Sequence, residues 1–203
     1  MSGACPTTPF PSKINLRSRT RNFSSSAMSG KKYSRAFGVQ LWEIDAIYPP
    51  MSRADFDAIY AFALAQSGTY GTFTFAAHDR RSPRGAASGS PYGAPVISGA
   101  GQTGSSINIT GLPVSTTGYL LPGDLVLLPG ATKVYMNTTS VDSDGSGDAT
   151  MTLNANVVSS PTNSAAITVL NVPFTVSLTE DIQELSTDHP NIYQFAMKMV
   201  EAL

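Results

Sequence analysis

The stretch GVQLWEIDAIYPP, residues 38–50, decides the fold of this 203-residue chain. Apolar and polar side chains alternate along it, with Trp42 and Ile44 falling on one face and Glu43 and Asp45 on the other. Such alternation predicts a β-strand that buries one face against a core. The two prolines at its end remove backbone donors and stop the strand.

A helix is predicted immediately after this strand, over residues 52–66. Ser52 is a favourable N-cap, and Asp55 falls in the first turn, where the helix dipole favours an anion. Gly68 provides a stop signal. The apolar residues recur at helical spacing and predict one buried stripe, formed by Phe56, Ile59, Tyr60, Ala63 and Leu64.

The C-terminal residues 192–200 form a second long alternating segment, with Tyr193, Phe195, Met197 and Met199 on one face. No strand follows it in the sequence, so we expect it to pair with the strand of residues 38–48 and to leave its other edge free for a partner. This pairing implies a discontinuous domain made of residues 37–90 and 171–203. Within it, strands are also predicted over residues 72–76 and 174–178, and an acidic loop over residues 180–190.

Residues 91–170 read as an inserted domain. Short alternating runs are separated by turns every 8–12 residues, a pattern typical of all-β folds. About five such strands fit a small barrel like the oligonucleotide/oligosaccharide-binding (OB) fold. The predicted fold class is therefore mainly β with one helix: a discontinuous β-sandwich or barrel-like domain with an inserted OB-fold-like barrel. The predicted strands of the insert are residues 105–110, 125–128, 134–136, 149–153 and 167–169.

Charge is scarce and unevenly distributed. Charged residues make up 13% of the chain and the formal net charge is −1, yet the first 42 residues hold seven basic groups and no acid. Residues 1–36 lack a clear period, so we expect a basic arm that is poorly ordered alone and is ordered by a partner. Weak contact with nucleic-acid phosphates is the alternative. The candidate partner-contact residues are Arg17, Arg19, Arg21, Lys31 and Lys32 in the arm and Tyr193, Gln194 and Lys198 in the C-terminal strand.

The single cysteine, Cys5, excludes an internal disulfide and a cysteine-based zinc site. The chain has no continuous apolar stretch like that of a signal peptide, and no run of about 18 apolar residues that could span a membrane. We therefore expect a soluble protein that is made in a cytosol.

Three motifs that could carry chemistry are incomplete. Gly99, Gly101 and Gly104 match the dinucleotide pattern G-x-G-x-x-G, but an alternating strand follows where a helix is required, so a turn is favoured. The loop at residues 142–148 resembles the start of a calcium loop, yet Leu153 occupies the position of the bidentate acid. The two histidines, His78 and His189, accompany no nucleophile elbow. We expect no catalytic residue, no cofactor and no metal.

Four segments together resemble one known family: the strand and helix of residues 40–66, the turn GQTGS at residues 101–105, the element LPGDL at residues 121–125, and the C-terminal VEAL. The chain resembles the distal tail proteins (Dit) of long-tailed siphophages, in the form with one inserted barrel. Each motif alone is loose, and their order and spacing across residues 39–203 carry the resemblance.

The resemblance implies a structural protein of the virion, assembled in the host cytoplasm. Six copies would form a ring at the tail tip, with the split domain around a channel through which DNA passes without specific binding. The ring would join the tail tube protein to the baseplate hub protein, with the tape measure protein as a further neighbour. No catalytic residue carries over. The alternative is a carbohydrate-binding adhesion module, in which the barrel binds a host-surface saccharide.

Overall fold

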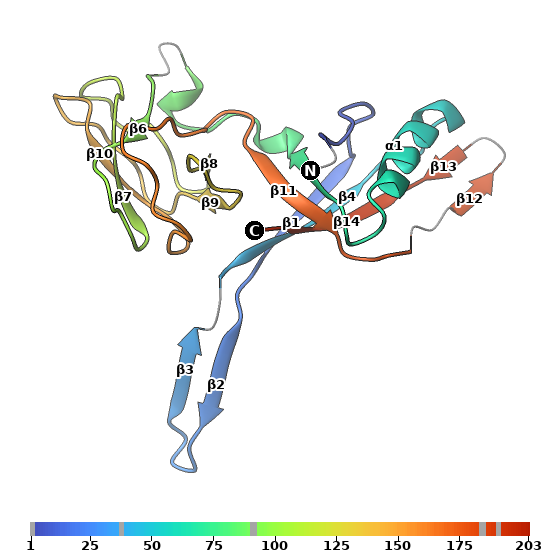
Figure 1. Cartoon of the computed structure of the whole chain (residues 1–203), viewed down its shortest axis with the longest axis horizontal. Coiled ribbons are helices and arrows are strands. Elements are labelled where there is room, and N and C mark those ends of the chain that lie inside the picture. The colour runs from blue at the N-terminus through green and yellow to red at the C-terminus, as the bar shows by residue number, and fades with distance from the viewer. Residues whose placement is uncertain (1–2, 37–38, 90–92, 183–185, 190–191) are drawn as a thin grey trace.

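The computed structural model describes residues 3–36, 39–89, 93–182, 186–189 and 192–203, with the backbone alone for 186–189. Its described part is mainly β, built from antiparallel sheets and a single α-helix, as the sequence predicts. A central sheet lies between the helix at one end of the molecule and a small barrel at the other, and a long hairpin projects from the sheet (Figure 1).

The central sheet joins strands from both ends of the chain. Its five strands are antiparallel and follow the order β1-β4-β14-β11-β5. The predicted pairing between the strand near residue 44 and the C-terminal strand is confirmed, with Ile44 opposite Met199. The strands are β1 (Lys13–Arg19), β4 (Leu41–Ile47), β5 (Thr72–Ala76), β11 (Pro173–Leu178) and β14 (Ala196–Glu201).

One face of this sheet is apolar across all five strands, because the register places the buried residues of neighbouring strands side by side. Helix α1 (Arg53–Ala65) contributes Phe56, Ile59 and Ala63 to the same core. Its predicted N-cap is confirmed: the Ser52 hydroxyl accepts a hydrogen bond from the Asp55 backbone N–H. The sheet contributes Ile14, Leu16, Trp42, Ile44, Ala46, Phe73, Phe75, Phe174, Val176, Leu178, Met197 and Met199.

Residues 1–36 are not the single arm that the sequence predicts. Ala4 forms an isolated β-bridge with Thr74 of β5, at one edge of the central sheet. Strand β1 forms the opposite edge. Only the hairpin of β2 (Asn22–Ser26) and β3 (Lys32–Ala36) projects from the molecule (Figure 1). The missed strand β1 carries only two apolar residues among polar and charged ones, too few to give a recognisable period.

The C-terminal segment also differs from its prediction. It forms two strands, β13 (Ile192–Gln194) and β14, separated at Phe195. Strand β14 lies inside the sheet between β4 and β11, so the expected free edge at this segment is wrong. The second partner of β14 is strand β11, which precedes it in the sequence and pairs with it in the antiparallel direction.

The predicted acidic loop of residues 180–190 is partly a hairpin. Strand β12 (Ser186–His189) pairs with β13 near helix α1 (Figure 1). Charged residues alternate with apolar ones too irregularly here for a strand to be predicted.

The insert forms a small antiparallel barrel around a second core. Its pairings close into a ring through β6, β7, β10, β9, β8 and residues 166–168, which pair back to β6. This ring has six segments, where the sequence predicts about five strands. Two short 3-10 turns, His78–Arg80 and Ala86–Ser88, connect the sheet to the barrel. The strands are β6 (Val96–Ile97), β7 (Ser106–Thr110), β8 (Leu125–Leu127), β9 (Val134–Met136) and β10 (Ala149–Thr152).

Candidate functional site

The most distinctive surface is the projecting hairpin of β2 and β3. From here on, the name arm means this hairpin, residues 20–36, and no longer the predicted arm of residues 1–36. All ten residues of its two strands are exposed, although Phe23 and Tyr33 are large aromatics, 73% and 57% exposed. A two-stranded hairpin without further support is only marginally stable in water. A surface of this kind is therefore expected to be covered by a partner.

The two faces of the arm differ in chemistry. Strand register places Phe23 opposite Arg35 and Ser25 opposite Tyr33 on one face, and the Lys31 ammonium lies 5.3 Å from the centre of the Tyr33 ring. We call these five residues the aromatic face. The other face carries small and polar residues, namely Asn22, Ser24, Ser26, Lys32, Ser34 and Ala36. Only the aromatic face offers large apolar groups together with cations.

Three predicted contact residues, Arg21, Lys31 and Lys32, belong to the arm and are exposed. Two others lie at its root, on the polar face of the central sheet. There Arg17 pairs with Asp45 at 2.9 Å, and Arg19 pairs with Glu43 at 3.1 Å. The carboxylates of β4 thus engage these two arginines within the chain, so they are weaker candidates than the arm residues.

Lys198 lies on the same polar face as this pair of arginines, opposite Asp45 in the register. Its ammonium forms an exposed ion pair with Glu180 at 2.9 Å, which raises the pKa of Lys198. Tyr193 is half-buried and stacks on Phe56 with ring centres 5.0 Å apart, whereas Gln194 is exposed. The predicted contact residues are therefore divided among the arm, the polar sheet face and the helix side.

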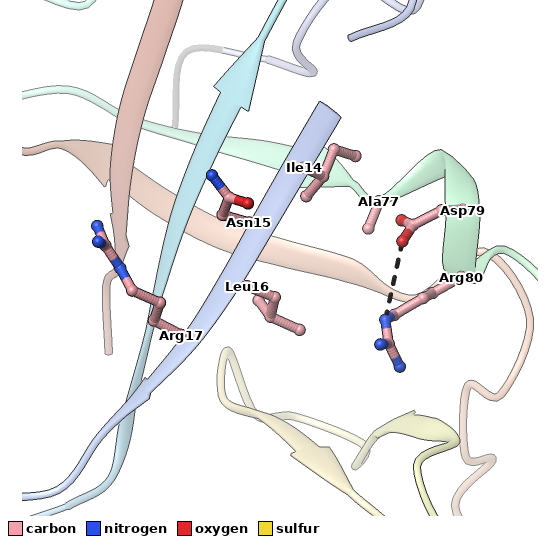
Figure 2. Close-up of a pocket in the computed structure, with 7 residues that line it drawn as sticks. All are labelled: Ile14, Asn15, Leu16, Arg17, Ala77, Asp79 and Arg80. Atoms are coloured by element: carbon pink, nitrogen blue, oxygen red, sulfur yellow. Dashed lines mark ion pairs between the residues drawn. The ribbon is translucent and has the colours of Figure 1, made fainter. Parts of the chain in front are cut away.

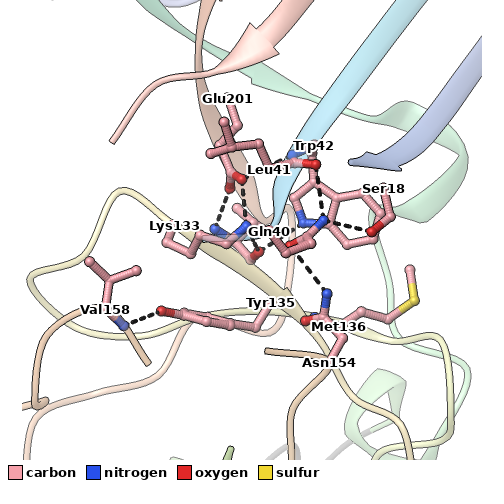
Figure 3. Close-up of polar contacts among 11 residues, drawn as sticks. Ser18, Gln40, Leu41, Trp42, Lys133, Tyr135, Met136, Asn154, Val158 and Glu201 are labelled. Carbon is pink, nitrogen blue, oxygen red and sulfur yellow. Dashed lines mark hydrogen bonds and ion pairs between the residues drawn. The ribbon is translucent and has the colours of Figure 1, made fainter. Parts of the chain in front are cut away.

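A buried polar junction, which the sequence does not predict, joins the barrel to the central sheet (Figure 3). Lys133 of the barrel and Glu201 of β14 form an ion pair at 2.5 Å with almost no exposed side-chain surface. The Glu201 carboxylate also accepts the backbone N–H groups of Trp42 and Val134. The indole N–H of Trp42 in turn donates to the Val134 carbonyl at 2.8 Å.

Burial sets the protonation behaviour of this junction. Removal from water raises the pKa of Glu201 and lowers that of Lys133, while their mutual attraction opposes both shifts. Lys133 also lies over the rings of Trp42 and Tyr135, at 5.8 and 5.6 Å from their centres. Each charge is thus held by several partners, as a buried ion pair requires. The only signal in the sequence is that Lys133 is the sole basic residue between residues 85 and 172.

A groove of about 460 Å³ opens between β1 and the turn at His78–Arg80, lined by Ile14, Leu16, Asp79 and Arg80 among others (Figure 2). Asp79 and Arg80 pair with each other at 3.9 Å. A neighbouring cavity of about 490 Å³ reaches the barrel at Asp124, whose buried carboxylate accepts two backbone N–H bonds. These charged groups serve contacts within the chain, and we assign no chemistry to the cavities.

The glycine motif and the aspartate loop are both turns. Gly99, Gly101 and Gly104 adopt left-handed backbone conformations and lead into strand β7, which confirms the predicted turn. In the loop at residues 142–148, the Asp144 carboxylate accepts the backbone N–H groups of Ser146 and Asp148, which lowers its pKa. This carboxylate therefore stabilises its own turn.

The structure describes the side chain of one of the two histidines. His78 packs beside Phe10 with ring centres 5.4 Å apart, and only the backbone of His189 is described. Within the described residues, no three His, Cys, Asp or Glu side chains gather as a metal site would require. Likewise, no helix in the described part of the chain has the length and apolarity needed to cross a bilayer.

Neither a protein-family model nor a curated protein sequence matches this chain.

Proposed function

We propose that this chain is a structural protein of a long-tailed phage tail tip, whose copies assemble into a ring of six. The ring would connect the tail tube protein to the baseplate hub protein and leave a channel for DNA, with the tape measure protein as a further neighbour. The sequence resemblance to distal tail proteins suggests this role. The protein would be assembled in the host cytoplasm and reside in the virion.

The observation that carries the proposal is the arm. Its strand residues are exposed on both faces, and Phe23 projects with 73% of its surface open to solvent. An arm that reaches from one copy to the next makes a heterologous contact, which closes into a ring when the rotation between copies permits. The single-helix β fold agrees with the same interpretation.

The alternative, a carbohydrate-binding barrel, receives less support. Sugar sites commonly use exposed aromatic rings that stack on the ligand, but Tyr119 and Tyr135 of the barrel are both fully buried. We therefore keep assembly as the proposed function.

Mass measurement and electron microscopy of the full chain test the proposal. We expect rings of about six copies with a central channel, formed alone or on mixing with a tail tube or hub protein. A chain that stays monomeric under all these conditions, and that binds glycans on an array, would overturn assembly in favour of adhesion.

A further inference from the structure

We propose that the aromatic face of the arm docks on the barrel of a second copy of this chain, at the end formed by Val114 and the loop of residues 142–148. This inference rests on the proposed function, and it names the surfaces through which the copies meet. Charge, exposed apolar groups and the geometry of the arm support this docking.

The arm and the barrel carry opposite exposed charges. The arm holds four basic residues and no acid. The barrel has one basic residue, Lys133, which is buried against Glu201 and contributes no exposed positive charge. Its exposed acids are Asp142, Asp144 and Asp148. The barrel of a second copy is thus a surface that attracts the arm and has no exposed cation to repel it.

The acidic end of the barrel also offers an apolar contact. Val114 is 61% exposed, and the next residue donates its backbone N–H to the Asp144 carbonyl at 2.8 Å. An exposed apolar residue thus adjoins the loop that carries the carboxylates, as Phe23 and Tyr33 accompany Arg35 on the arm. Aromatic and arginine side chains contribute most to binding where they become buried at an interface.

The contact must form between copies of the chain. In one molecule the arm extends away from both the barrel and the helix (Figure 1). Its aromatic face is open to solvent there. A contact between different surfaces of identical chains propagates from copy to copy, which is the property that ring assembly needs.

Single charge reversals on the two faces of the arm give a matched test. Arg35→Glu changes the aromatic face, and Lys32→Glu makes the same change in charge on the opposite face of the same strand. Both positions are exposed, so both variants should fold, which circular dichroism checks. Sedimentation velocity then measures self-association of each full-length variant at low and moderate salt.

We expect Arg35→Glu to weaken association by at least about tenfold and Lys32→Glu by less than about twofold. Phe23→Ser should also weaken it about tenfold without any change in charge. Equal effects at positions 35 and 32 would overturn the assignment of the aromatic face.

A compensating reversal identifies the partner surface. The Asp142 and Asp144 carboxylates accept backbone N–H bonds that hold their loop, so the reversal is made at Asp148. Arg35→Glu combined with Asp148→Lys should recover at least half of the lost association energy. No recovery would overturn docking on the barrel.

The outcomes separate this inference from the proposed function. If the wild-type chain assembles and Arg35→Glu assembles equally well, the arm contact is wrong and ring assembly stands. If the wild-type chain assembles neither alone nor on mixing with a tail tube or hub protein, both fail. If the wild-type chain is instead retained on duplex DNA at moderate salt, and Arg35→Glu abolishes that retention without affecting association, the arm binds nucleic acid and the inference is overturned.

Discussion

At the residue scale, the buried ion pair between Lys133 and Glu201 has a large energetic consequence. Burial removes the hydration of each charge. The opposite charge and the surrounding hydrogen bonds compensate for this loss. Removing one partner leaves the other charge buried and uncompensated. Removing both leaves a neutral site of similar volume.

Lys133→Met should therefore destabilise the fold by about 3–5 kcal/mol. In a chain of this size that loss lowers the melting temperature by roughly 10 °C. The double variant Lys133→Met/Glu201→Gln should lose less free energy of unfolding than the two single variants lose in sum, by at least about 2 kcal/mol. The reason is that no unpaired charge remains in it. Thermal and denaturant unfolding of the four proteins, followed by the fluorescence of Trp42 at the junction, measures this cycle.

Lys198→Met is the control for this cycle, since it breaks an exposed ion pair with Glu180. Surface pairs contribute little, so its melting temperature should stay close to that of the wild type. Strictly additive effects at positions 133 and 201 would contradict a coupled pair.

Cys5 is a second residue whose chemistry is set by burial. Its thiol lies 3.9 Å from the Tyr48 hydroxyl, and burial raises the pKa of Cys5 to about 11. Because the thiolate is the reactive form, the native protein should react very slowly with a thiol reagent near neutral pH. The rate should rise with pH and level off only above about pH 11, as long as the fold persists. Rapid reaction of the native chain near neutral pH, at the rate seen in denaturant, would show that Cys5 is accessible.

At the element scale, the turn at Ala86–Ser88 attaches the connecting segment to the barrel through tight backbone packing. Gly85 precedes it, and a Cβ atom at this position would lie 2.4 Å from the Tyr119 carbonyl oxygen. The backbone N–H groups of Ala86 and Ala87 donate to the carbonyls of Gly118 and Tyr119. The absence of a side chain at residue 85 therefore permits these hydrogen bonds.

Gly85→Ala should cost about 1–3 kcal/mol, because rigid backbone atoms would have to move apart. Gly89→Ala is the matched control at the other end of the same turn, where the closest atom to an added Cβ is 3.4 Å away. Chemical denaturation of both variants measures the difference. An equal loss at the two positions would mean that helical or turn propensity, and not the close approach at Gly85, sets the cost.

The elements that the sequence predicts well are those with dense apolar periodicity. Alternation around Trp42 and Ile44 identifies β4, and helical spacing with a capping Ser52 identifies α1. Strand β1 is not predicted, because Ile14 and Leu16 are its only apolar residues and two are too few to show an alternating pattern. Its place is set by pairing with β4, which is a tertiary interaction.

The candidate site is predicted only in part, for the same reason. The arm's basic residues are visible as a local excess of charge, but its hairpin form depends on the register that β1 and β4 impose at its root. The Lys133–Glu201 pair joins residues that are far apart in the sequence, so no local sequence pattern can predict it.

At the scale of the whole molecule, we expect the barrel and the central sheet to unfold together. The sheet core includes Leu125 and Val134 of the barrel, and the junction around Glu201 crosses the same boundary. An inserted domain that shares core residues and a buried ion pair with the domain around it is not expected to unfold separately. A cooperative transition is therefore expected for the chain.

Trp42 makes this cooperativity measurable, because it is the only tryptophan in the chain and lies at the junction. Its indole is buried and donates to the barrel's Val134 carbonyl, so its fluorescence reports separation of barrel from sheet. In the wild type, the fluorescence and circular-dichroism transitions should coincide. In Lys133→Met the fluorescence transition should come first, because loss of the ion pair loosens the junction before the strands melt. If the two transitions still coincide in this variant, at a lower temperature, the ion pair stabilises the whole fold rather than the joint between its two parts.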